Sequence, residues 1–204
     1  MAEPITLQFT GHVTHGGGEL EAFFPIDSSF TWTLTYESDF PASVDGVHAF
    51  PTEATTDQLQ WVATGSGGSY TRAMDRPHQT WIHVRPEDAE IFFDTSISGR
   101  AVTGTILTTP TRTLYPIAFD SWFSFPGQTF DSFALPRALP DAPMVGGFHM
   151  MYATDPGCGC SMDSFSGTWT HVEQVRVPEP ATALLAGLGL LGAVYSRVRR
   201  RRDH

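Results

Sequence analysis

Phe30-Thr31-Trp32-Thr33-Leu34-Thr35-Tyr36 alternates large apolar side chains with threonines. Successive side chains of a β-strand point to opposite faces of the sheet, so this pattern places the large residues on one face and the threonines on the other. Threonine and the aromatic residues are also enriched in strands. The stretch therefore predicts a strand with one buried face and one polar face, which is typical of an antiparallel sheet.

The same period of two occurs on both sides of this strand. Before it, Ile5 to Thr14 alternates in the same way and is ended by Gly16-Gly17-Gly18. After it come further strand candidates: 58–64, 80–84, 90–94, 101–108, 114–125, 130–135, 145–153 and 165–175. No clear helical periodicity precedes Pro180. Short strands separated by glycine- and proline-containing turns predict an all-β fold, an antiparallel β-sandwich or jelly-roll-like ectodomain over residues 1–176.

The charge of the chain is unevenly distributed. Residues 1–176 contain 20 Asp and Glu against seven Arg, a formal charge of −13, and the sequence has no lysine. Such an acidic body repels phosphate backbones, so nucleic acid is excluded as a partner. It favours cations and solubility outside the cell.

The last 28 residues differ from the rest in composition. Residues 181–196 carry no charge and are rich in leucine and glycine, which membrane helices tolerate. At 1.5 Å per residue they cover about 24 Å, somewhat less than the hydrocarbon core. The arginines that follow mark a cytoplasmic side and can extend a short span by reaching outward: Arg197, Arg199, Arg200, Arg201 and Arg202. We therefore predict one C-terminal transmembrane helix and a cytoplasmic tail, 197–204. The alternative is a buried C-terminal helix followed by a solvated basic tail.

A proline-rich motif precedes this segment. Pro178 and Pro180 each fix their own φ and push the residue before them toward extended conformations, so Val177-Pro178-Glu179-Pro180 forms a stiff, unpaired segment that another protein can read. The motif, the apolar segment and the arginine cluster together closely resemble the PEP-CTERM sorting signal of exported proteins in Gram-negative bacteria that make extracellular polysaccharide. The opening strands, Phe9 to Thr14 and Phe30 to Asp39, also resemble those of many PEP-CTERM ectodomains.

The resemblance implies a processing enzyme and a destination. An exosortase, a membrane-embedded transpeptidase-like enzyme, would cut near residues 177–180 and free or transfer the preceding domain. The protein would be an inner-membrane-anchored precursor and then a cell-surface or extracellular protein of the bacterial envelope. Met1-Ala2-Glu3-Pro4 has neither a basic start nor an apolar core. We therefore expect a secretory signal to precede Met1.

Cys158-Gly159-Cys160 is the first candidate for chemistry in the body. In an exported protein we expect the thiols to be oxidised, which makes a local disulfide between Cys158 and Cys160 one interpretation. A free or intermolecular pair and a metal site are the alternatives. Zinc motifs usually separate their cysteines by two to four residues and need a second ligand pair. We predict no metal site and no cofactor.

Catalytic motifs are also sparse. The eight histidines form neither an HxH nor an HExxH pattern, and no serine lies in G-x-S-x-G. Glu87, Asp88, Glu90 and Asp94 form the densest carboxylate group, which lacks the glycine of a calcium loop and is interpreted as a solvated acidic loop. We therefore predict no catalytic residue, and a body that is not an enzyme.

The aromatic residues leave two further functions open. Most tryptophans of an all-β domain pack in the core, but one or two on an exposed face would make a platform for sugar rings. The five candidates are Trp32, Trp61, Trp81, Trp122 and Trp169. A concave face with exposed Trp beside Asp or Asn would favour a lectin-like module that binds the exopolysaccharide of a biofilm. Two carboxyls about 5 to 10 Å apart in a cleft would favour a glycoside hydrolase.

Overall fold

The computed structural model of the chain describes residues 4–42, 45–51, 58–72, 79–95, 101–155 and 162–175. These residues form twelve strands and two short 3-10 helices, η1 and η2: β1 (Pro4–Gly16), η1 (Gly18–Ala22), β2 (Ser29–Glu37), β3 (Val47–Pro51), β4 (Leu59–Gly65), β5 (Gly68–Arg72), β6 (Gln79–Arg85), η2 (Pro86–Asp88), β7 (Glu90–Thr95), β8 (Val102–Gly104), β9 (Leu107–Thr108), β10 (Thr113–Ser124), β11 (Val145–Ala153) and β12 (Met162–Val175). In this part of the chain no helix has the length and apolar character needed to cross a bilayer. The predicted transmembrane helix, 181–196, lies outside it.

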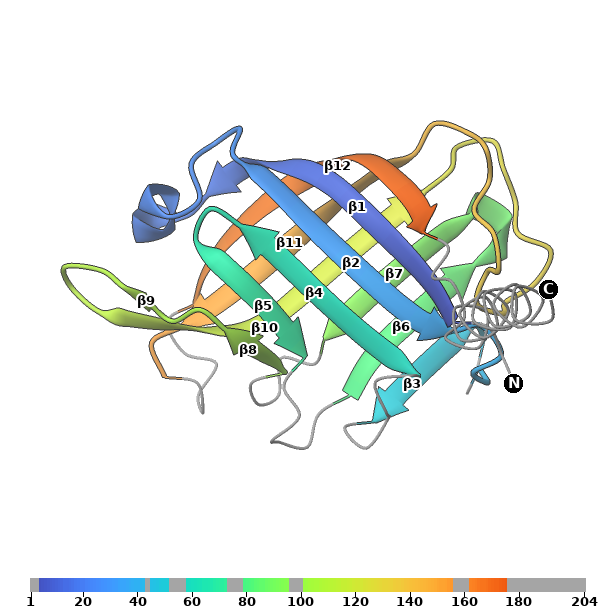
Figure 1. Ribbon diagram of the computed structural model, residues 1–204, viewed down its shortest axis with the longest axis horizontal. Helices are drawn as coiled ribbons and strands as arrows, with labels where there is room; N and C mark the ends of the chain where they lie inside the picture. Colours follow the sequence, from blue (N-terminus) through green and yellow to red (C-terminus); the bar gives the residue numbers. More distant parts are fainter. Residues whose placement is uncertain are drawn as a thin grey trace, which may run out of the picture.

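The strands form one antiparallel sheet. Their order is β3-β6-β7-β10-β11-β12-β1-β2-β4-β5-β8, and β9 pairs with β10 beside this path. The first and last strands are neighbours in its middle, where Thr6 pairs with Val175 and Gly16 with Phe165. The described chain therefore begins and ends at the same end of the sheet (Figure 1).

The predicted two-sheet sandwich is corrected to a single sheet that curls back on itself (Figure 1). Trp32 of β2 lies 5.0 Å from Phe93 of β7, measured between ring centroids, although four strands separate β2 from β7 in the sheet order. Such a contact requires the two halves to face each other. They remain joined because β12 pairs with β11 on one side and with β1 on the other. Register shifts in β1 after Thr10 and Val13 occur in this joining region, where bulges increase local twist and bending.

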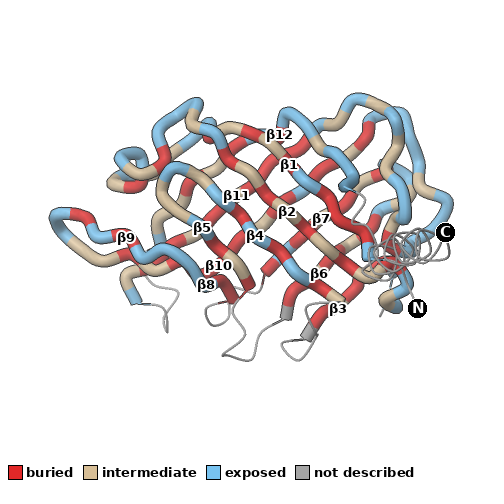
Figure 2. The backbone as a smooth tube through the Cα atoms, viewed as in Figure 1, coloured by how far each residue is buried: buried red, intermediate tan, exposed pale blue. Residues whose placement is uncertain are grey.

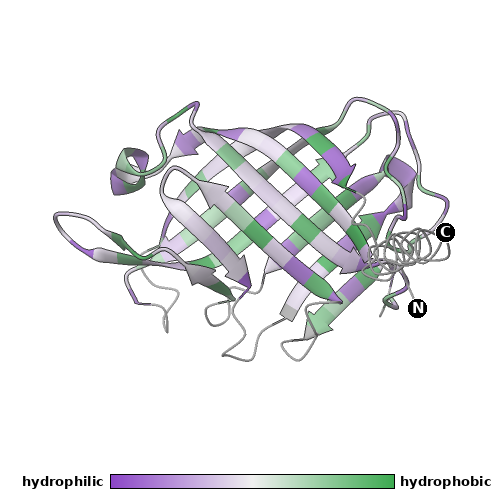
Figure 3. Cartoon of the chain, in the orientation of Figure 1, coloured by the Kyte–Doolittle hydropathy of each residue, from purple (hydrophilic) through white to green (hydrophobic). Residues whose placement is uncertain are grey.

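The core lies between the two halves of the curl and is largely aromatic. Along β2 every second residue is buried, as the alternation predicted, and the same alternation of burial and hydropathy follows the other long strands (Figures 2 and 3). Phe9 stacks on Trp32 at 4.6 Å and approaches Phe123 of the opposite half at 4.8 Å. Nearly all buried apolar residues belong to one cluster, so the described residues share one hydrophobic core.

A long connection, residues 125–144, crosses the end of the curl where β1 begins, and we call it the strap (Figure 1). Tyr36 donates a hydrogen bond to the carbonyl of Pro136 (2.7 Å), and Gln174 donates one to the carbonyl of Arg137 (2.9 Å). A strand was predicted at 130–135, but this part of the strap is irregular. Its prolines remove backbone donors, and its carbonyls accept from side chains instead.

Other predicted strands agree with the structure, with three differences. β3 and β5 were missed, because β3 is a short edge strand and β5 follows directly on a glycine-rich turn at Gly65. The strand predicted at 101–108 is divided into β8 and β9.

The division of the chain into 1–176 and 177–204 stays a prediction, since the described residues end at Val175.

Candidate functional site

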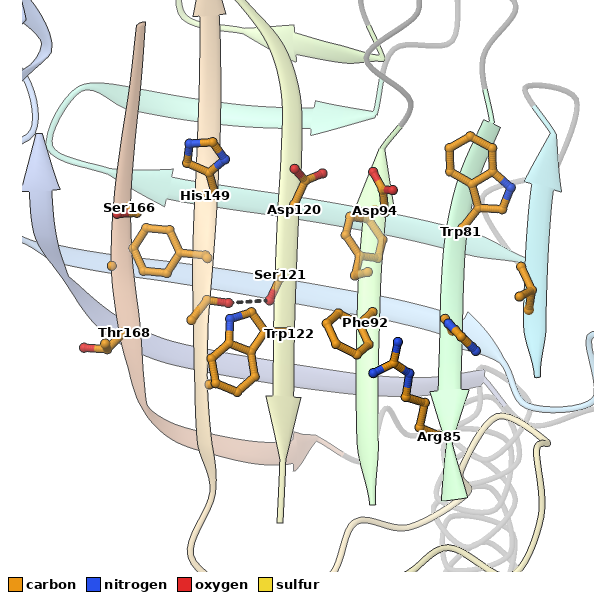
Figure 4. Close-up of a pocket in the computed structure, with 17 residues that line it drawn as sticks. Trp81, Arg85, Phe92, Asp94, Asp120, Ser121, Trp122, His149, Ser166 and Thr168 are labelled. Atoms are coloured by element: carbon orange, nitrogen blue, oxygen red, sulfur yellow. Dashed lines mark hydrogen bonds between the residues drawn. The ribbon is translucent and has the colours of Figure 1, made fainter. Parts of the chain in front are cut away.

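A groove of about 740 Å³ lies on the outer face of five adjacent strands, β6, β7, β10, β11 and β12 (Figure 4). On β10 the inner face is given by the buried residues Phe119, Ser121 and Phe123, and the residues between them, Asp120 and Trp122, point outward. At about 4.8 Å between strands, five strands give a surface roughly 19 Å wide. This is wide enough for an extended ligand.

Cross-strand register places one row of polar and aromatic groups along this face. Trp81 is opposite Asp94, Asp120 is opposite His149, and His149 is opposite Ser166. The β7–β10 register ends with Phe93 opposite Ser121, and its continuation by one residue brings Asp94 beside Asp120. The carboxyl row is formed by Trp81, Asp94, Asp120, His149 and Ser166. Figure 4 shows the carboxylates of Asp94 and Asp120 side by side, with Trp81 and His149 beyond them. The row exists because adjacent antiparallel strands present directly opposite residues on the same face.

The next row toward the β6–η2 end contains His83, Phe92, Trp122, Gly147 and Thr168, in register across the same five strands, and we call it the indole row. Trp122 is 40% exposed. A Cβ atom added at Gly147 would lie 3.4 Å from Trp122 Nε1. The indole therefore lies beside a backbone position that has no side chain. The missing side chain leaves room beside the ring for a ligand.

Two of the aromatic rings in the groove are free to stack with a ligand. The Arg85 guanidinium lies 4.7 Å from the centroid of the Phe92 ring and so covers one of its faces. No ring stacks on Trp81 or Trp122 among the residues that the structure describes. Strand spacing separates the two indoles by roughly 10 to 12 Å, too far to clamp one ring between them. They can instead contact successive rings of one chain-like ligand.

The two carboxyls of the carboxyl row influence each other. Burial and the neighbouring carboxyl of Asp94 together raise the pKa of Asp120 to about 7. The backbone N–H of Thr95, which donates to Asp120 Oδ1 at 3.3 Å, acts in the opposite direction. Asp120 therefore keeps its proton through the mildly acidic range, as expected for a partly buried carboxyl beside a second carboxyl. Burial also lowers the pKa of His149, so this imidazole is neutral at pH 7.

Asp120→Asn should stabilise the protein at pH 8 and leave its stability at pH 4 almost unchanged. Below about pH 4 the carboxyl is protonated in both the folded and the unfolded chain. Between about pH 4 and 7 only the folded chain keeps the proton, so wild-type stability falls as pH rises through this window. The amide removes that loss, which we expect to be on the order of 2 kcal/mol at pH 8.

Urea unfolding of both proteins at several pH values measures this difference. Asp27→Asn is the matched control, because Asp27 is exposed and outside the groove, and its φ of 66° is one that asparagine tolerates. Parallel pH profiles for wild type and Asp120→Asn would contradict the raised pKa of Asp120.

The expectation that most tryptophans are core and one or two face outward is confirmed. Trp32, Trp61 and Trp169 are buried in the core, and Trp81 and Trp122 line the groove.

The interpretation of 87–94 as one acidic loop is wrong for Glu90 and Asp94, which lie on β7. Sequence reasoning missed the other groove residues. Asp120 and Trp122 alternate with Phe119 and Phe123, which predicts that the two pairs lie on opposite faces of a strand. This alternation does not say whether the face with Asp120 and Trp122 is packed against other residues or open to a ligand.

The predicted sorting residues and cysteines belong to the part of the chain that the structure does not describe. Val177, Pro178, Glu179 and Pro180, the arginines of 197–202, and Cys158 and Cys160 all lie outside the described residues. Their predicted roles, including the disulfide, stay predictions. Among the described residues no three His, Cys, Asp or Glu side chains are grouped closely enough to hold a metal ion.

Fold and groove together define an all-β protein whose curled antiparallel sheet carries an aromatic and carboxyl-lined groove on its outer face. Comparison with protein families adds its targeting: residues 176–201 match the PEP-CTERM protein-sorting motif. The chain therefore carries this sorting signal, which supports an exported protein of the cell envelope that an exosortase processes. No curated protein and no solved structure matches the chain.

Proposed function

We propose that the sorted protein is a non-catalytic glycan-binding module of the cell surface or extracellular matrix, and that the groove is its carbohydrate site. The observation that carries this proposal is the pair of unstacked outer-face indoles, Trp81 and Trp122, beside the carboxyls of Asp94 and Asp120. Flat apolar rings beside hydrogen-bonding groups suit sugars, whose rings have apolar faces and hydroxyl edges. An extracellular polysaccharide is the ligand that an exported location makes accessible.

Hydrolysis is the alternative that a carboxyl pair raises. Glycosidases separate their two carboxyls by about 5 to 5.5 Å or 6.5 to 9.5 Å, leaving room for the sugar or for sugar and water. Asp94 and Asp120 instead lie side by side on adjacent strands (Figure 4), and the negative charge of Asp94 helps to raise the pKa of Asp120. Such close neighbours leave little room between them for a sugar and a water molecule, which supports a role in holding a ligand rather than in cleaving one.

The same proposal places the protein first at the inner membrane and then outside the cell. Residues 181–196 would hold the precursor in the membrane with the arginine cluster on the cytoplasmic side. Processing at residues 177–180 would then release or transfer residues 1–176 to the cell surface. The groove would meet the polysaccharide only after that step.

Trp122→Ala should weaken binding to the ligand polysaccharide about 30-fold, the effect of losing a central aromatic contact worth about 2 kcal/mol. The full chain, purified in detergent, is titrated calorimetrically with a panel of neutral, acidic and amino polysaccharides. Phe133→Ala is the control: Phe133 is an aromatic of the strap, 49% exposed and outside the groove. Unchanged binding by the double variant Trp81→Ala/Trp122→Ala would reject the groove as the site.

A further inference from the structure

Charge around the groove is unevenly placed, and this bears on the kind of glycan that the proposed function would bind. Arg85 of β6, the arginine that lines the groove, is paired with Glu90 at 3.3 Å between Nη1 and Oε2 and is stacked on Phe92. Its charge is therefore already compensated. Asp94 and Asp120 lie at the centre of the carboxyl row, with Trp81 on one side and His149 on the other.

Two carboxyls directly opposite each other on adjacent strands repel when both are ionised. Within the part of the chain that the structure describes, the influences that act on Asp120 come from burial, Asp94 and the Thr95 N–H, with no guanidinium among them. A positive group placed between the two carboxylates would remove the repulsion and satisfy their oxygens. The strand pairing thus holds two acceptors in a geometry that suits an ammonium group, which offers several N–H donors.

The rest of the groove also favours a cationic sugar over an anionic one. Faces of tryptophan rings attract cations through the ring quadrupole, and Trp81 is the direct cross-strand neighbour of Asp94. Burial lowers the pKa of His149, which disfavours the charged imidazolium that would attract an anionic group to this row. The formal charge of −13 on residues 1–176 repels uronic acid polymers at longer range.

We propose that the groove selects glycans carrying free amino groups, with one ammonium group held between Asp94 and Asp120 while neighbouring sugar rings stack on Trp81 and Trp122. This rests on the proposed function. Binding places one ammonium group between two carboxylates, so Asp120 gives up the proton that it carries in the free protein. That proton passes to the solvent, and no bond between heavy atoms is made or broken. Selectivity for amino sugars and proton release are therefore two consequences of the same contact.

The test compares glucosamine oligosaccharides with N-acetylglucosamine oligosaccharides of the same length, because acetylation removes the charge and keeps the ring. The full chain in detergent is titrated near pH 5.5 in two buffers that differ in protonation enthalpy. We expect the amine form to bind at least tenfold more tightly and to release up to one proton per site. The acetylated form should release none.

Asp94→Asn and Asp120→Asn are tested separately, so that a folding defect in one leaves the other informative. Each should reduce the preference for the amine form to less than threefold. Asp120→Asn should also abolish proton release, because it removes the group that gives up the proton. Asp27→Asn should leave both unchanged, and Trp122→Ala should weaken both ligands equally and keep the preference.

Equal affinity for the two oligosaccharides, or a preference that survives both Asp variants, would overturn the selectivity while leaving glycan binding intact. If neither oligosaccharide nor any polysaccharide of the panel bound to the wild-type protein, the proposed function itself would be wrong.

Discussion

Trp32→Ala should lower the free energy of unfolding by about 3 to 5 kcal/mol, the range for removing a large aromatic side chain from a core. Trp32 is fully buried at the point where the two halves of the curled sheet meet. It stacks on Phe9 at 4.6 Å and lies 5.0 Å from Phe93, 5.4 Å from Phe119 and 5.9 Å from Trp169, measured between ring centroids. Rings from both halves surround it, so they cannot collapse into the cavity without uncurling the sheet.

Two further variants separate the cavity from other effects. Trp122→Ala removes the same side chain from the outer face and should cost only about 1 kcal/mol. Trp32→Phe should cost no more than about 1.5 kcal/mol, because the indole Nε1 has no hydrogen-bond partner in the described structure and its loss leaves no orphaned group. Denaturant unfolding measures all three. A cost for Trp32→Ala no larger than that for Trp122→Ala would contradict the assignment of inner and outer faces.

Glu179→Ala should leave the protein inserted in the membrane but unprocessed. Glu179 supplies the one charge between Pro178 and Pro180, in a segment that the two prolines keep extended for the exosortase. The matched control is Glu173→Ala, an exposed carboxylate near the end of β12. Protein size and membrane fractionation in a host with an exosortase report the outcome. If Glu179→Ala gave the same shortened, surface-released product as wild type, the motif would not be the recognition element.

Replacing Arg199 to Arg202 with serine should produce a different defect. Each arginine resists transfer across the bilayer by about 2.5 to 3.5 kcal/mol, so the cluster should hold the C-terminus on the cytoplasmic side. Its loss should therefore weaken anchoring and orientation. Normal membrane fractionation and orientation of this variant would show that the arginines are dispensable.

Most long strands could be predicted from sequence because a period of two is a local property. The strands predicted at 30–36 and 145–153 are present as β2 and β11, the latter with the same bounds. β3 was not predictable in this way, since its five residues form a strand only through pairing with β6. The prediction at 130–135 failed for the opposite reason: apolar residues of the strap pack against the end of the core without joining the sheet.

The candidate site was only partly predictable. The excess of aromatic residues raised sugar stacking as an alternative, but alternation divides residues into two faces without saying which face is covered. Asp94 was noticed as part of an acidic cluster, and Asp120, 26 residues later, was not. Their proximity depends on the β7–β10 register, which no local pattern shows.

The sequence by itself determined the all-β class, the acidic character of the body and the C-terminal sorting signal, because alternation, charge count and a contiguous motif are each readable along the chain. Only the tertiary structure decided that the strands form one curled sheet, that Trp32 is core while Trp81 and Trp122 are accessible, and that Asp94 faces Asp120. The physical reason is that a strand's register is chosen by burial over the whole sheet, and a shift of one residue would exchange the two faces.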